Sequence, residues 1–109
     1  MLTEEQENQF DRIRKEHNLS AAFSVQGVKP EDLTNEVPDH IEYIVFVDWY
    51  RHTGKEFKKK VGRKPSWFAL WKLHSEFLDK TENERHIYFE GYEPDEKGRP
   101  GYFKISAGS

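Results

Sequence analysis

The longest apolar stretch of the chain covers residues 41–51 and is rich in β-branched and aromatic side chains. Alternate positions point to opposite faces of an extended chain, and here both faces carry apolar residues, as Tyr43 and Ile44 illustrate. The pattern therefore predicts a strand in the centre of a sheet. Residues 52–55 follow with a Thr-Gly pair, which predicts a two-residue hairpin turn because glycine readily adopts positive φ.

The predicted turn also fixes a pairing register for the hairpin. With Thr53 and Gly54 at the turn, the second strand covers the lysine-rich segment that follows. The expected cross-strand pairs are Arg51 with Glu56, Tyr50 with Phe57, Trp49 with Lys58, and Asp48 with Lys59. Opposite-charge and aromatic pairs of this kind each stabilise a sheet by roughly 0.2–1 kcal/mol, so the register is internally consistent.

Two segments have helical patterns. Thr3 and Gln6 form a capping-box pattern, which predicts a helix to about His17 with Asn18 as a left-handed end. Ser66 predicts the start of a second helix, which has an aromatic-rich apolar face. The residues of that face fall within an arc of about 120° on a helical projection: Trp67, Leu70, Trp71, His74, Phe77 and Leu78.

The remaining segments predict shorter elements. Residues 20–26 alternate between apolar and polar and predict a short strand, and residues 29–39 predict a loop with one helical turn near Pro30. Residues 86–92 and 101–105 predict a second hairpin, joined by a long charged loop at 93–100.

These elements predict a small α+β domain with the order α-β-β-β-α-β-β and a mostly antiparallel sheet, one face of which is covered by the aromatic-rich helix. We assign residues 1–106 to this single domain and residues 107–109 to a tail. The first five elements resemble a double-stranded-RNA-binding domain in their order, and in that family basic residues at the start of the second helix contact phosphates. The resemblance is confined to element order, since this second helix carries tryptophans in place of small residues and the carboxyl-terminal hairpin is additional.

Composition excludes several classes of chemistry. Among the 109 residues there is no cysteine, so the chain has no disulfide, thiolate zinc site or cysteine nucleophile. The five histidines show no metal-binding spacing, and we predict neither a metal nor another cofactor. The amino terminus lacks a signal-peptide pattern and no apolar run could span a membrane, so we expect a soluble cytoplasmic protein.

Charge is concentrated in one segment. The formal net charge is −3, yet residues 55–64 hold six cations and one acid, a local charge of +5. Such a segment before a helix amino terminus predicts contacts with a nucleic-acid backbone, and the residues we assign to these contacts are Lys58, Lys60, Arg63 and Lys64. Trp49 or Tyr50 is a candidate for base stacking. The alternative is an edge strand whose lysines prevent pairing between sheets.

An enzymatic interpretation depends on one motif. Pro38-Asp39 and Glu56-Phe57-Lys58 match a nuclease signature that needs both carboxylates on one metal ion. In the predicted register Glu56 faces Arg51, twelve residues from Asp39, which corresponds to about 40 Å of extended chain. Because the chain also lacks a nucleophile elbow and a glycine-rich phosphate loop, we expect no enzymatic activity.

The sequence therefore predicts a small non-enzymatic binding module. The alternative to nucleic acid is a protein partner, with the module acting as an inhibitor or adaptor, for example an anti-defence protein of the kind that phages carry. The residues assigned to that alternative lie in the acidic loops and beside them: Glu31, Asp32, Glu36, Asp39, Tyr92, Asp95, Glu96 and Tyr102. The sequence leaves the choice of partner and the oligomeric state open.

Overall fold

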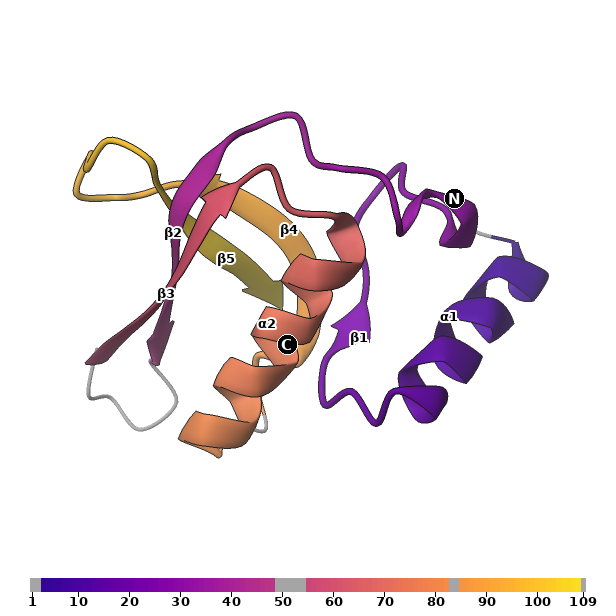
Figure 1. Cartoon of the computed structure of the whole chain (residues 1–109). Helices are drawn as coiled ribbons and strands as arrows, with labels where there is room; N and C mark the ends of the chain where they lie inside the picture. Colours follow the sequence, from indigo (N-terminus) through magenta and orange to yellow (C-terminus); the bar gives the residue numbers. More distant parts are fainter. Residues whose placement is uncertain (1–2, 49–54, 83–84, 109) are drawn as a thin grey trace.

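A computed structural model describes residues 3–48, 55–82 and 85–108, with the side chain of residue 48 excepted. The α+β class and the order α-β-β-β-α-β-β are confirmed. The elements are α1 (Glu4–Glu16), β1 (Ala22–Phe23), the 3-10 turn η1 (Pro30–Asp32), β2 (Ile41–Asp48), β3 (Lys55–Arg63), α2 (Trp67–Thr81), β4 (Tyr88–Pro94) and β5 (Tyr102–Gly108). Figure 1 shows α2 lying across the sheet and α1 set to one side, next to β1.

The five strands form one mixed sheet with the order β1-β4-β5-β2-β3. The β2–β3 and β4–β5 hairpins are antiparallel. They are joined by a parallel pairing of β2 with β5, and β1 pairs in parallel with β4. Strand β5 continues to Gly108, into the predicted tail, because Ala107 and Gly108 pair with β4. The sheet therefore leaves β1 at one edge and the lysine-rich β3 at the other.

The predicted register of the first hairpin is wrong by four residues. Lys58 lies opposite Val45, and Lys59 lies opposite Ile44 in place of Asp48, which instead pairs with Lys55. The connection between the strands is thus longer than the predicted two-residue turn. The predicted turn and the predicted partners Trp49, Tyr50 and Arg51 lie outside the described residues. Because four is an even number, each residue of β3 keeps its expected face of the sheet, and only its neighbours change.

Local signals at the helix ends are confirmed. The Thr3 hydroxyl accepts from the Gln6 N–H at 3.1 Å, and the Gln6 side chain accepts from the Thr3 N–H at 3.0 Å. Asn18 follows α1 with a φ of 52°. The Ser66 hydroxyl accepts from the Ala69 N–H at 3.1 Å and so caps α2. These contacts satisfy N–H groups that a helix cannot pair internally.

The core lies between α2 and one face of the sheet. Its fully buried side chains include Trp71, Phe89, Ile44 and Leu70. The Trp71 indole N–H donates to the Ala21 carbonyl at 2.9 Å, which ties α2 to the chain just before β1. Helix α1 contributes a single buried side chain, Phe10, so it packs on the rest of the fold over a narrow contact.

Candidate functional site

The basic segment forms an exposed edge of the sheet beside the amino-terminal half of α2. Within the described part of the chain, strand β3 pairs with β2 alone, so its outer side is open there. Between this edge and α2 lies a groove of about 230 Å³. Its lining contains the cations Lys59, Lys60, Arg63 and Lys72, one acid, Glu76, and the apolar residues Val61, Pro65, Ala69 and Leu73. The site thus combines an apolar floor with four cations against one carboxylate.

The four residues predicted to contact phosphates are divided between the two sides of β3. Arg63 lines the groove, and so does Lys60, although Lys60 pairs with Tyr43 and by strand alternation shares the sheet face of Lys58. Lys64 is exposed in the short segment that leads from β3 into α2. Lys58 pairs with Val45 and lies on the sheet face that is turned away from α2. The structure therefore brings these cations to one edge, although they do not share one surface.

On that opposite face, Lys58 lies over two stacked tyrosine rings. Tyr43 of β2 and Tyr102 of β5 have ring centroids 4.8 Å apart. The Lys58 Nζ lies 5.4 Å from the centroid of Tyr43 and 5.9 Å from that of Tyr102. An ammonium group at this distance is attracted by the negative face of an aromatic ring. Val45, the β2 partner of Lys58, is only 1% exposed.

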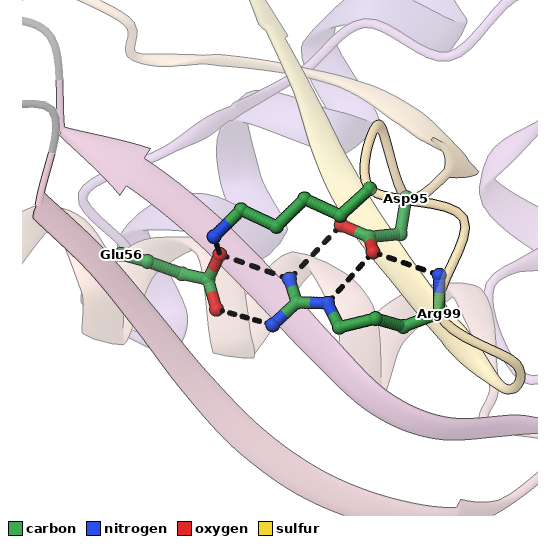
Figure 2. Close-up of polar contacts among 4 residues, drawn as sticks. Glu56, Asp95 and Arg99 are labelled. Carbon is green, nitrogen blue, oxygen red and sulfur yellow. Dashed lines mark hydrogen bonds and ion pairs between the residues drawn. The ribbon is translucent and has the colours of Figure 1, made fainter.

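The charged loop between β4 and β5 is tied back to this same face. The Arg99 guanidinium donates to both carboxylate oxygens of Glu56 on β3, each at 2.9 Å. It also donates to both oxygens of Asp95, at 2.8 and 3.0 Å (Figure 2). The Lys97 ammonium lies 3.4 Å from the Glu56 carboxylate. Planar two-point contacts of this kind fix geometry as well as charge, so the loop has a defined position over the sheet.

The ion pairs of this loop shift the pKa values of its charged groups. The Arg99 guanidinium lowers the pKa of Asp95 to about 2 and also lowers the pKa of Glu56. The two carboxylates in turn raise the pKa of Arg99. Hydrogen bonds from Lys104 to Glu96 and Glu93 raise the pKa of that lysine. The charges of the loop therefore neutralise one another within the molecule.

Most residues assigned to the acidic alternative have partners inside the chain. Asp32 accepts from the Lys29 N–H at 3.0 Å, and Asp39 accepts from the Tyr92 hydroxyl at 2.8 Å. Asp95 and Glu96 are paired as described above, and Tyr102 belongs to the tyrosine stack. Glu31 and Glu36 are exposed. The acidic set is thus divided between a loop before β2 and the β4–β5 connection.

Tyr92 joins these two acidic regions. Its ring lies 5.9 Å from that of Trp67 and 5.5 Å from that of Phe103. Burial, together with the hydrogen bond to Asp39, raises the pKa of the Tyr92 hydroxyl. The hydroxyl therefore remains a proton donor to the carboxylate across the neutral range.

The nuclease motif is not assembled. Glu56 faces Val47, and Asp39 lies eight residues before Val47, about 26 Å of extended chain. Both carboxylates are also bonded elsewhere, to Arg99 and to Tyr92. Within residues 3–48, 55–82 and 85–108, no group of three or more histidine, aspartate or glutamate side chains could hold a metal ion. In the same residues no helix is long and apolar enough to cross a membrane.

Sequence reasoning missed Lys59, Lys72, Tyr43 and Arg99. The predicted register places Lys59 opposite Asp48, and the helix pattern gives no sign that the exposed Lys72 lines a groove with β3. Arg99 carries a local signal that could have identified its first contact, since Asp95 precedes it by four residues. Its second contact, with Glu56, joins residues 43 positions apart and depends on the sheet order.

Comparison of the chain with protein-family models, with curated proteins and with solved structures finds no match.

Proposed function

We propose that this protein is a non-enzymatic binding module that contacts a nucleic-acid backbone through the β3 edge and the adjoining turn into α2. The observation that carries the proposal is the groove beside β3, where Lys59, Lys60, Arg63 and Lys72 come together on two different elements. Lysine and arginine side chains that neutralise phosphates release condensed counterions from the nucleic acid, and this release favours binding.

The charges around the site support this choice of partner. Lys60 lies 4.0 Å from Glu42 and its side chain is 68% exposed, so this pair is weak. Among the residues that the structure describes, Lys59, Arg63 and Lys64 have no carboxylate within ion-pair distance. The acids of the alternative surface, by contrast, are largely bonded within the chain. The second candidate function is that of an inhibitor or adaptor that binds a protein partner through its acidic loops. Glu31 and Glu36 are the exposed carboxylates of this surface.

The test is a fluorescence-anisotropy titration of labelled DNA and RNA, single- and double-stranded, at about 50 and 200 mM salt. The variant Lys60→Glu/Arg63→Glu should weaken binding at both salt concentrations and reduce the dependence of affinity on salt. The matched control is Arg12→Glu/Lys15→Glu, which changes the net charge equally at exposed positions of α1. If the control loses as much affinity as the β3 variant, overall charge accounts for binding and the site is wrong.

Absence of binding to every nucleic acid at the lower salt concentration would reject the proposal. Affinity capture with the intact chain, compared with its Glu31→Lys/Glu36→Lys variant, would then test the acidic alternative.

A further inference from the structure

The tyrosine stack lies directly beside the basic edge. Strand pairing places Tyr102 of β5 next to Tyr43 of β2, and Tyr43 next to Lys60 of β3. Directly opposite residues in a sheet share a face, so the two rings and Lys60 follow one another across the surface, with Lys58 over the rings. The side of the sheet turned away from α2 therefore presents an aromatic pair bordered by lysines.

From this arrangement we infer that Tyr43, together with Lys58, forms a stacking site for an unpaired base of a single-stranded nucleic acid whose backbone follows β3. The inference rests on the proposed function and names the class of nucleic acid. Each of its two components, an aromatic face and a positively charged track, is typical of sites for single strands.

The geometry distinguishes Tyr43 from Tyr102. The Arg99 guanidinium carbon lies 4.4 Å from the centroid of the Tyr102 ring, and Tyr43 stacks on the same ring at an interplanar angle of 28°. Tyr102 is thus enclosed between Arg99 and Tyr43, whereas Tyr43 is the last ring before the edge strand. Because Arg99 is itself held by two carboxylates, the rings are positioned before any ligand binds, which lowers the entropic cost of binding.

The Lys58 ammonium can move from the tyrosine rings to a phosphate. Its side chain is exposed, and its ammonium lies over the two rings. Among the described residues no carboxylate lies within ion-pair distance of it. A base that stacks on Tyr43 can displace this flexible ammonium toward the phosphate on its 5′ or 3′ side. Arg99 and Lys104, in contrast, are already paired with carboxylates on the same face.

A duplex does not fit this site. Its bases are paired and stacked in its interior, so no base plane is available to a ring on the surface of a sheet, whereas single strands can present unstacked bases. The inference therefore predicts a preference for single strands, a property that a purely electrostatic edge does not produce.

The experiment compares Tyr43→Leu with Tyr43→Phe in titrations of a labelled oligothymidine and of a duplex of equal length. Loss of one base-stacking contact lowers affinity for the single strand roughly 5- to 160-fold, by the usual strength of such contacts. We expect this loss in Tyr43→Leu, near-normal binding in Tyr43→Phe, and little change for the duplex. The slope of affinity against salt should be unchanged in Tyr43→Leu, because no phosphate contact is removed. Tyr88→Leu, at the 41%-exposed tyrosine of β4, is the matched control.

The possible outcomes are separable. If the wild-type chain binds no nucleic acid, the proposed function itself fails. If it binds but prefers duplex or shows no preference, or if folded Tyr43→Leu binds the single strand normally, the proposed function stands and the stacking site is rejected. The preference of the wild-type chain is measured by competition between unlabelled single strand and duplex. The absence of a preference for single strands would therefore reject the stacking site even if Tyr43→Leu does not fold.

Discussion

Arg99 and Glu56 form a two-point ion pair that joins the β4–β5 loop to the edge strand, with both N–H···O distances at 2.9 Å. Lysine carries the same charge but cannot supply two parallel donors from one planar group. We therefore expect Arg99→Lys to lower the urea midpoint of unfolding, and Arg99→Ala to lower it further. In a double-mutant cycle with Glu56→Gln, the combined loss should be smaller than the sum of the single losses. Strict additivity in the cycle would show that the pair contributes nothing to stability.

The same cluster predicts a stability loss in acid. The pKa of Asp95 is about 2 in the folded chain, because Arg99 stabilises the carboxylate, and about 4 when unfolded. A lowered folded-state pKa means that the unfolded state binds more protons in this range. The contribution of Asp95 is thus complete above about pH 4 and is lost as the pH falls toward 2. Urea titrations of Arg99→Gln at several pH values should show a shallower acid loss than those of the wild type.

Gly98 and Gly101 form a matched pair for testing the close contact between the β4–β5 loop and Glu42 of β2. Both have left-handed backbones, with φ of 69° and 75°. A Cβ at Gly98 would meet nothing within 4 Å, whereas one at Gly101 would lie 2.9 Å from the Glu42 Cβ. We expect Gly98→Ala to cost about 1 kcal/mol for backbone strain alone. Gly101→Ala should cost roughly 2–3 kcal/mol, because the steric overlap is added.

The Gly101 substitution should also disturb the sheet. The Glu42 and Tyr43 N–H groups both donate to the Gly101 carbonyl, at 2.9 and 3.2 Å, where the pairing of β2 with β5 begins. Amide hydrogen exchange should therefore accelerate at these two residues in Gly101→Ala and not in Gly98→Ala. Equal costs and equal exchange in the two variants would contradict the close approach.

Local sequence signals are enough to predict the helices and strands of this fold, but not how these elements are arranged. Capping residues such as Thr3 and Ser66 act on backbone groups within three positions, so the helix starts could be predicted. The register of the first hairpin was misjudged because Thr53-Gly54 suits a tight turn, while the contacts that select the true register, Phe46 with Phe57 among them, depend on packing across the whole sheet.

The candidate site shows the same limit. The basic segment was visible as a run of charges, and its position at an edge was one of the two interpretations. The groove that Lys72 shares with β3 depends on how α2 packs on the sheet, and the stacking of Tyr43 on Tyr102 requires the parallel pairing of β2 with β5. That pairing joins residues 59 positions apart through a strand order that local patterns do not encode.

Trp71 is the largest of the fully buried side chains among the described residues. It is fully buried, and its ring packs against Phe23 with centroids 5.1 Å apart. Trp71→Ala should lower the free energy of unfolding by about 3–5 kcal/mol, the usual range for large buried aromatics. Trp71→Phe should cost about 1–3 kcal/mol, because the Ala21 carbonyl loses its donor while most of the ring is kept. Urea titrations followed by far-ultraviolet circular dichroism measure both, and a negligible loss in Trp71→Ala would contradict this packing.

Only one of the two ring nitrogens of His74 has a hydrogen-bond partner among the described residues. The side chain is completely buried, and its Nε2 lies 3.0 Å from the His86 carbonyl, to which it donates as N–H. The Nδ1 has no hydrogen-bond partner among the described residues. Rings of Phe46 and Phe89 lie 5.7 and 5.8 Å away. Burial in this apolar setting lowers the pKa of His74 to about 4.

This lowered pKa predicts a second pH dependence, at higher pH than that of Asp95. Between about pH 4 and 6.5 the unfolded state binds a proton at His74 that the folded state does not, so stability falls as the pH falls through this range. The limiting slope for one group is about 1.4 kcal/mol per pH unit. We expect His74→Gln, which does not titrate and can still donate to the His86 carbonyl, to reduce this slope in urea titrations from pH 4 to 7. His40→Gln, at an exposed histidine, is the control and should leave the wild-type slope unchanged. If His74→Gln retains the full slope, protonation of His74 is not what destabilises the fold in weak acid.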